Sequence, residues 1–219
     1  MAMRFIWLTS LTALIILMAS CSSKVKKTYH ENGKLSAILR YEDGLLHGMC
    51  EWYFANGNPM MRAEYSHNQL NGKQERYFEN GVLQNVAWYK NNLLDSLMLH
   101  YNIYGKLVLK EFYRNDTLNG PIVRYYDDGS VFLEGTYSKG MMDGSWVFYT
   151  PDGGIAGKGE FSMGSGTQKA WYPNGKTQRI IHYKDNIKHG LEEHFQPDGK
   201  LVLRRIFEMG NLVSEEQFD

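Results

Sequence analysis

Polar and apolar residues alternate along most of the chain, and glycines interrupt the alternation at a fixed interval. In the segment after Gly33, Leu35, Ala37, Leu39 and Tyr41 share one side of an extended backbone, with polar residues mostly between them. Successive side chains of a strand point to opposite faces, so a period of two predicts strands. After the first twenty residues no stretch shows the 3.6-residue period of an amphipathic helix. The pattern therefore predicts an all-β protein.

Turn-forming pairs divide these strands into repeats. Successive pairs place their glycines 24 residues apart, with one spacing of 22. Asn-Gly and Asp-Gly supply the positive φ angles of a two-residue hairpin turn, so we expect such a turn at each pair. The pairs are Asn32-Gly33, Asn56-Gly57, Asn80-Gly81, Tyr104-Gly105, Asp128-Gly129, Asp152-Gly153, Asn174-Gly175 and Asp198-Gly199.

A second glycine column predicts a turn at the other end of each hairpin. Its members stand fifteen residues after the first glycine. They are Gly48, Gly72, Gly120, Gly144 and Gly190, with Ser96 as the one substitution. In the 22-residue repeat, Gly164 and Gly166 are expected to tighten the turn.

Two further columns are aromatic in every repeat. One stands four residues before the first glycine: Tyr29, Tyr53, Tyr77, Tyr101, Tyr125, Tyr149, Trp171 and Phe195. The other stands eight residues after it: Tyr41, Tyr65, Tyr89, Tyr113, Tyr137, Phe161, Tyr183 and Phe207. Rings at matched cross-strand positions stabilise a sheet, so we interpret both columns as packing residues.

These columns together predict the architecture of residues 29–219. A lone hairpin buries too little surface to offset its chain entropy, whereas stacked hairpins shelter one another. We therefore expect about eight 24-residue β-hairpin repeats, arranged as one elongated antiparallel meander sheet. Strand twist should coil this sheet.

One repeat resembles a known family. The segment 133–146 looks like a MORN repeat, with Gly135, Tyr137, Gly140 and Gly144 on the motif positions, and 158–161 echoes it. The other copies depart from that pattern, with Ala63 and Ala87 at the first glycine and Asn68 and Asn92 at the second. They are more similar to bacterial MORN-variant repeats. The resemblance covers about residues 29–212 and implies a non-catalytic scaffold that binds proteins and sometimes lipids.

The N-terminal 28 residues carry a different kind of signal. Residues 1–20 have one charge, Arg4, followed by an apolar run of signal-peptide length. The run ends in Leu17-Met-Ala-Ser20-Cys21, which resembles a bacterial lipobox with cleavage after Ser20 and lipid attachment at Cys21. Residues 21–28 then read as the lipidated cysteine and a polar, flexible tether. An ordinary signal peptide, or an anchor helix with an incidental cysteine, is the alternative.

The lipobox predicts a membrane-anchored lipoprotein of the cell envelope, on the outer membrane if the cell has one. Ser22 looks like an outer-membrane sorting residue. Composition points away from nucleic acid as a partner, because Lys+Arg and Asp+Glu both number 24 and leave no net field to attract a polyanion.

Recognisable chemistry is scarce along the chain. No histidine spacing suggests a metal site, and the adjacent acids Glu192-Glu193 would point to opposite faces of a strand. The glycine-rich 153–159 segment is followed by strand-pattern residues, whereas a phosphate loop needs a helix there. We therefore predict no enzyme activity, no cofactor and no metal, and we expect Cys50 to be buried and unreactive.

Aromatic residues outside the two columns remain as candidate contacts, which we place on the face opposite the columns. They are Trp52, Phe54, Phe78, Trp88, Tyr126 and Trp146. The leading hypothesis is a lipid-anchored scaffold for a protein partner. The alternatives are a module that binds glycans or the cell wall, or an antitoxin or immunity protein, which only the family resemblance suggests.

Overall fold

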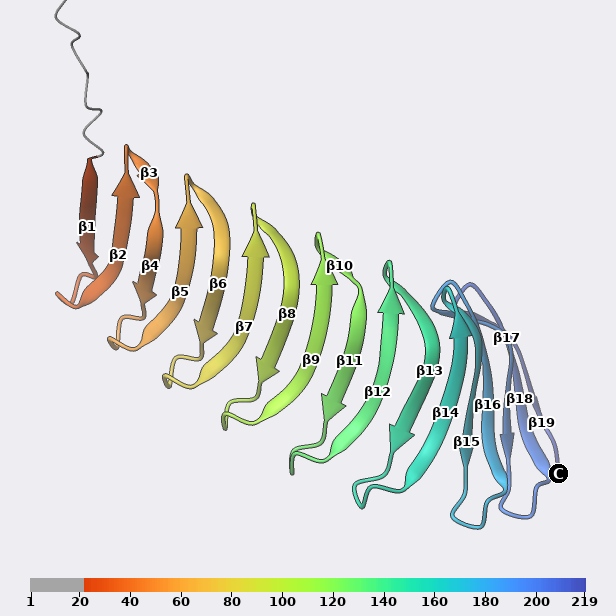
Figure 1. The fold of residues 1–219 in the computed structure, drawn as a ribbon. Coiled ribbons are helices and arrows are strands. Elements are labelled where there is room, and N and C mark those ends of the chain that lie inside the picture. The colour runs from red at the N-terminus through yellow and green to blue at the C-terminus, as the bar shows by residue number, and fades with distance from the viewer. Residues whose placement is uncertain (1–21) are drawn as a thin grey trace, which may run out of the picture.

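The computed structural model describes residues 22–219, which form a single open sheet of nineteen strands (Figure 1). Successive hairpin arms pair antiparallel in chain order, so the sheet is a meander. Residues 22–219 contain no helix. The predicted all-β meander is therefore confirmed.

The strand bounds show the repeat directly, with two strand positions in each repeat. The strands are β1 (Ser23–Tyr29), β2 (Leu35–Glu42), β3 (Leu45–Leu46), β4 (Gly48–Tyr53), β5 (Pro59–Ser66), β6 (Gln69–Tyr77), β7 (Leu83–Lys90), β8 (Leu93–Tyr101), β9 (Leu107–Arg114), β10 (Thr117–Leu118), β11 (Gly120–Tyr125), β12 (Val131–Ser138), β13 (Met141–Tyr149), β14 (Ile155–Ser162), β15 (Ser165–Trp171), β16 (Thr177–Lys184), β17 (Ile187–Phe195), β18 (Leu201–Glu208) and β19 (Asn211–Gln217). The short β3 and β10 form one hairpin arm with β4 and β11, respectively.

The first strand begins earlier than the sequence suggested. β1 pairs with β2 from Ser23 to Tyr29, so the expectation of a flexible tether over 21–28 is wrong from Ser23 onward. The lysines of this segment suit an edge strand, because their ammonium groups reach solvent while the backbone makes its ladder. The array consequently starts at β1.

The Asn-Gly and Asp-Gly pairs do not form two-residue turns. Between β1 and β2 the connection is the five-residue loop 30–34, in which Gly33 N–H donates to the His30 carbonyl at 2.9 Å. Of the Asn32-Gly33 pair only Gly33 has a positive φ, 78°. The Asn32 Oδ1 accepts from Lys34 N–H at 3.1 Å and thereby shapes the loop. We call this edge of the sheet the loop edge.

The two-residue turns lie at the opposite edge, which we call the turn edge. Both residues of each turn have positive φ, as in His67 (51°) and Asn68 (66°). This is the type I′ geometry that suits the twist of a hairpin. The turn expected at Gly164 is confirmed, whereas Gly166 lies in β15. In the other repeats the turn lies four residues before the second glycine column, where the sequence had placed it.

The second glycine column forms bulges inside the strands, so the prediction of turns there is wrong. In the β5–β6 hairpin, two steps from Ala63 to Tyr65 face four steps between Leu70 and Gln74. Gly72 lies in this bulge with a φ of 131°. A Cβ at Gly72 would lie 2.0 Å from the Glu64 Oε2, so the bulge also requires the missing side chain.

The two faces of the sheet differ in packing. One face, the packed face, carries the central row that includes Cys50, Ala63, Gln74 and Ala87, which are directly opposite one another and 0–4% exposed. Cys50 is a free, buried thiol, as predicted. The other face, the open face, carries cross-strand ion pairs such as Arg62–Glu51. The packed face is where apolar surface is most fully removed from water.

Hydrogen bonds link successive repeats along both edges of the sheet. At the turn edge, Asn92 N–H donates to the Leu70 carbonyl at 2.9 Å, and Leu70 N–H donates to Asn92 Oδ1 at 2.7 Å. At the loop edge, Asn56 Nδ2 donates to the Glu79 carbonyl at 2.8 Å. The repeated asparagines therefore link neighbouring hairpins as well as shaping their own.

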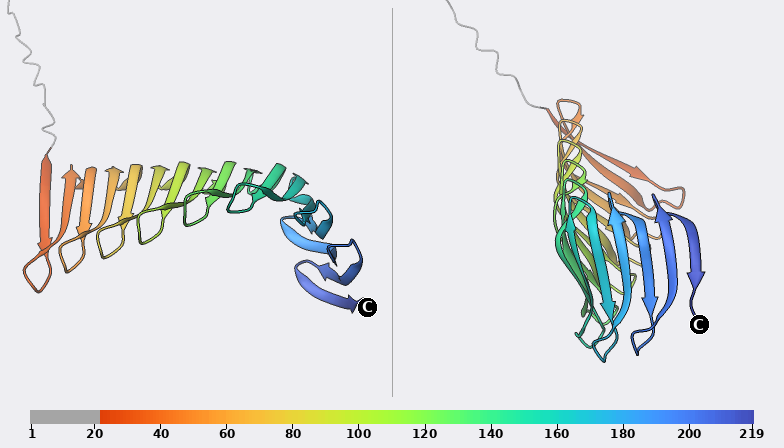
Figure 2. Two further views of the ribbon diagram at one scale, coloured as in Figure 1. Left: turned by 90° about the horizontal axis from the view of Figure 1, so that it is seen from below. Right: turned by 90° about the vertical axis from the view of Figure 1, so that its right-hand side faces the viewer.

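The array runs nearly straight from β1 to β13 and then turns sharply near β14 and β15 (Figure 2). A hydrophobic cluster lies at this bend and contains Ile122, Leu133, Trp146 and Phe161. Trp146 lies against Gly135, where a Cβ would come within 2.3 Å of its ring. The bend thus gives the single sheet its most extensive apolar cluster among the described residues.

The 22-residue repeat explains where the bend lies. In the β14–β15 hairpin the pairing runs without a register shift from Gly157↔Ala170 to Ser162↔Ser165. The two missing residues are therefore those of the bulge that the other hairpins carry. Bulges increase the local twist of a sheet and bend the strand that carries them. We therefore attribute the change of direction to the absence of a bulge from the β14–β15 hairpin.

Ser96 has a backbone conformation that favours glycine, which leads to a prediction about stability. It has a φ of 115° in the bulge of the β7–β8 hairpin, where five other repeats have glycine. Backbone strain of this kind costs about 1–3 kcal/mol, and glycine in a strand costs about 0.5–1 kcal/mol. We expect Ser96→Gly to raise the free energy of unfolding by about 1 kcal/mol, measured by urea denaturation.

Ser145→Gly is the matched control, because Ser145 lies in β13 without a positive φ. It should lower the free energy of unfolding. An equal effect of the two substitutions would contradict the assignment of strain to Ser96.

Candidate functional site

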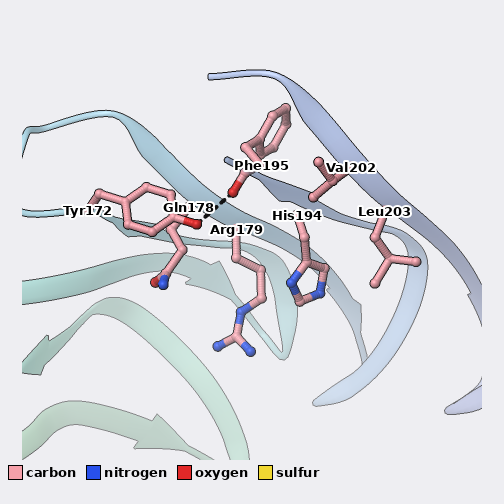
Figure 3. A pocket seen from close by; sticks show the side chains of 7 residues that line it. All are labelled: Tyr172, Gln178, Arg179, His194, Phe195, Val202 and Leu203. Atoms are coloured by element: carbon pink, nitrogen blue, oxygen red, sulfur yellow. Dashed lines mark hydrogen bonds between the residues drawn. The ribbon is translucent and has the colours of Figure 1, made fainter. Parts of the chain in front are cut away.

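The candidate site is a groove at the loop edge of the bent C-terminal part, made of two adjoining hollows of about 440 and 400 Å³. Tyr172 and Gln178 line both hollows and lie where the two meet. The first hollow, shown in Figure 3, is also lined by Arg179, His194, Phe195, Val202 and Leu203. The second is also lined by Thr150, Asp152, Gly154, Ile155, Ala156, Trp171 and Pro173.

Strand register places the first hollow's side chains together. Arg179 on β16 stands directly opposite His194 on β17, which stands opposite Leu203 on β18. These three residues therefore share the packed face, and Figure 3 shows Arg179 and His194 side by side. Tyr172 reaches across the loop edge and donates its hydroxyl hydrogen to the Phe195 carbonyl at 2.8 Å. This bond fixes the upper rim of the hollow.

A buried carboxylate forms a hydrogen bond with His194. Glu192 is 2% exposed, and its two oxygens lie 2.5 Å from Lys188 Nζ and 2.8 Å from His194 Nε2. Burial raises the pKa of Glu192, but the hydrogen bonds from Lys188 and His194 outweigh it, so the pKa lies below its usual value. The carboxylate therefore stays ionised and holds the imidazole in place.

Arg179 contributes a positively charged side chain to the groove. Within residues 22–219 no carboxylate lies within ion-pair distance of its guanidinium group. Its neighbours at the site are the imidazole of His194 and the amide of Gln178. A guanidinium group in this setting can bind a carboxylate through two parallel hydrogen bonds, while the flanking rings offer apolar surface.

The six aromatic residues predicted as contacts do not line this groove. Trp88 alone lies on the open face, opposite Lys73, although Tyr53 and Tyr77 of one aromatic column lie on that face as well. Trp52 lies on the packed face opposite Ala37, and Trp146 is 4% exposed inside the bend cluster. The prediction that these two residues lie on the reverse face is therefore wrong, because their rings fill space above small residues of the packed face.

The other three predicted contacts lie in the loop edge instead of on a face. Phe54, Phe78 and Tyr126 are the first residues of their loops, and each donates its N–H within the loop. Tyr126 also donates its hydroxyl hydrogen to the Tyr149 carbonyl of the next repeat at 2.7 Å. Their placement favours a role in loop stacking. Ser20 and Cys21, the predicted cleavage and lipidation residues, lie outside the described residues.

The groove residues Tyr172, Arg179 and His194 were not among the residues predicted from the sequence. Their polar side chains stand at positions that vary between repeats, so no column marks them. The one available signal was the 22-residue spacing, since the groove borders the repeat that lacks a bulge.

Residues 22–219 contain neither a metal-binding cluster nor a helix that could span a membrane. No group of three or more His, Cys, Asp or Glu side chains is placed to hold a metal ion. In the same range, no helix has the length and apolarity needed to cross a bilayer.

Comparison with known families supports the repeat assignment. The model of the MORN repeat variant matches residues 24–43, 46–67, 70–91 and 165–185. Each matched segment contains one loop of the loop edge and ends close to a type I′ turn. The chain therefore carries MORN-like repeats, as the sequence predicted. No curated protein matches the chain.

The lowered pKa of the Glu192 carboxylate predicts that the stability of the fold depends on pH. The pKa of Glu192 is lower in the folded chain than its usual value, so its contribution to stability is present above the usual glutamate pKa and disappears as pH falls through the folded pKa. We expect Glu192→Gln to reduce the free energy of unfolding by about 1–3 kcal/mol at pH 7. The reduction should shrink as pH falls below the usual glutamate pKa and through the lower pKa of the folded chain. Urea denaturation across this range measures it.

Glu160→Gln is the control, because Glu160 is exposed on β14. It should change stability little at any pH. A Glu192→Gln effect that persists unchanged at low pH would contradict an ionised carboxylate.

Proposed function

We propose that this chain is a non-catalytic, lipid-anchored scaffold of the cell envelope that binds an acidic segment of a protein partner in the C-terminal groove. The observation that carries the proposal is Arg179, which lies in a groove bordered by rings and has no ion-pair partner among residues 22–219. The MORN-like repeats are compatible with it, since repeat arrays present extended binding surfaces.

The proposed anchor follows from the lipobox that ends at Cys21. Because β1 begins at Ser23, only Ser22 separates the acylated residue from the sheet. The array would be held against the headgroup region with little slack. Ser22 favours the outer membrane in a cell that has one.

The proposed partner segment is extended and acidic. The groove is open and runs along the loop edge, and its two hollows adjoin at Tyr172 and Gln178. One carboxylate of the segment would receive the Arg179 fork, and neighbouring side chains would pack on Tyr172 and Phe195. Desolvated arginine and aromatic groups typically dominate the energy of such contacts.

A second candidate function is glycan or cell-wall binding. The hollow beside β14 brings Trp171 and Tyr172 together with the carboxylate of Asp152 and the amide of Gln178. Rings offer stacking surface to a sugar, and the polar groups offer hydrogen bonds to its hydroxyls. Soluble wall fragments titrated against tryptophan fluorescence would distinguish this function from peptide binding.

Arg179→Gln tests the groove. A charge-assisted hydrogen-bonded contact is worth about 1.5–3 kcal/mol, so the substitution should weaken binding of an extended Glu- and Asp-rich peptide by about tenfold or more. Fluorescence anisotropy with a labelled peptide pool measures the dissociation constant. Arg114→Gln, at an exposed position of β9 away from the groove, is the control and should bind normally. Equal affinities for both variants would remove Arg179 from the proposal.

Cys21→Ser tests the anchor. Without the thiol no diacylglycerol can be attached, so the chain should leave the membrane fraction and lose the acyl mass. Cell fractionation with intact-mass spectrometry reads out both changes. Retention of the variant on the membrane with unchanged mass would show that Cys21 is not the lipidation site.

A further inference from the structure

The two outermost strands of the sheet carry opposite charge. β1 contains Lys24, Lys26 and Lys27, and within the described chain none of these ammonium groups has an ion-pair partner. β19 contains Glu215 and Glu216. Each strand pairs on one side only, so its other side presents unpaired N–H and C=O groups that can accept a further strand.

These charges match in height along the strand. Lys26 stands opposite Leu39, six residues after the first glycine of its repeat, and Glu215 stands opposite Arg205, also six residues after its glycine. Lys27 and Glu216 match in the same way, opposite Ile38 and Arg204, each five residues after its glycine.

The charges also match in face. Lys26 and Glu215 both belong to the packed face. Lys26 stands opposite Leu39, which shares its face with Ala37 two residues away. Glu215 stands opposite Arg205, which in turn stands opposite the buried Glu192. Lys27 and Glu216 both belong to the open face. The two strands run in the same direction, from the turn edge to the loop edge (Figure 1).

We propose that β19 of one copy pairs in parallel with β1 of a second copy, with Lys26 beside Glu215 and Lys27 beside Glu216. The contact joins copies head to tail and continues the sheet from one chain into the next. Sheets that contain both parallel and antiparallel pairs are common. The pairing also covers Val25 and Val213, which are 57% and 60% exposed.

The charges disfavour the symmetric alternatives. Two β1 edges would bring lysines together, and two β19 edges would bring glutamates together, and like charges across a strand pair are destabilising. Glu215 also has an intrachain partner, Arg205 at 2.7 Å, and Glu216 has Arg204 at 3.9 Å. Both carboxylates are partly exposed, which leaves oxygen lone pairs for a second cation.

The contact is heterologous, so it can repeat from copy to copy and give rings or filaments. The N-terminus of every copy would leave β1 at the turn edge. All anchors of an assembly would therefore lie along one edge, which is compatible with attachment to one membrane. The pairing does not depend on the C-terminal groove, so either proposal can fail without the other.

Disulfide trapping tests the register. Neighbouring strands lie about 4.8 Å apart, within the Cα separation of about 4.4–6.8 Å that a disulfide spans. The full chain in detergent with Lys26→Cys and Glu215→Cys should form a ladder of disulfide-linked multimers under mild oxidation. Lys27→Cys with Glu215→Cys, which places the thiols on opposite faces, is the matched control and should form few. Cys50 is fully buried, and the unsubstituted chain measures the background from native thiols.

A charge-reversal pair tests the electrostatics by sedimentation velocity at low salt. Glu215→Lys with Glu216→Lys, and separately Lys26→Glu with Lys27→Glu, should each weaken self-association by about tenfold or more. Mixing the two variants should restore assembly, because every junction between unlike copies then carries opposite charges. Equal cross-linking of the matched and mismatched cysteine pairs would overturn the proposal. Dimers formed by Glu215→Cys alone would also overturn it, since they would report a contact between two β19 strands.

Discussion

The whole structure depends on the contact between neighbouring hairpins, because a one-layer sheet has no second layer to pack against. The most deeply buried residues of its straight part are accordingly small: Cys50 and Ala63 are 0% exposed and Ala87 is 1% exposed. Hydrogen bonds along both edges, such as Asn92 to Leu70 and Asn56 to Glu79, add a second set of links between repeats. Each hairpin is therefore stabilised mainly by its two neighbours.

The same constraint explains why one irregular repeat matters so much. Every other hairpin keeps a bulge, and the sheet advances evenly until the β14–β15 hairpin, where the bulge is absent. The sheet changes direction there, and the change brings large rings such as Trp146 and Phe161 together. It also leaves the groove beside Tyr172 and Arg179 at the loop edge. A deletion of two residues thus produces both the main apolar cluster and the candidate site.

Much of the architecture could be predicted, because the 24-residue period and the aromatic columns repeat eight times and average out local ambiguity. The details that failed are those in which one residue type serves two geometries. Asn-Gly fits a two-residue turn and a five-residue loop equally well, and a glycine such as Gly72 fits a turn or a bulge. The lysines before Tyr29 suggested a tether, although an edge strand tolerates them too. The groove around Arg179 could not be predicted from the sequence, since it arises from a bend that depends on strand register.

Native-state hydrogen exchange along the array is the most direct measurement of neighbour-dependent stability. If each hairpin depends on its neighbours, amide protection should be greatest in β11–β14 around the apolar cluster and should decline stepwise toward β1 and β19. Uniform protection from end to end, lost in a single transition, would show that the array unfolds as one unit and would contradict this account.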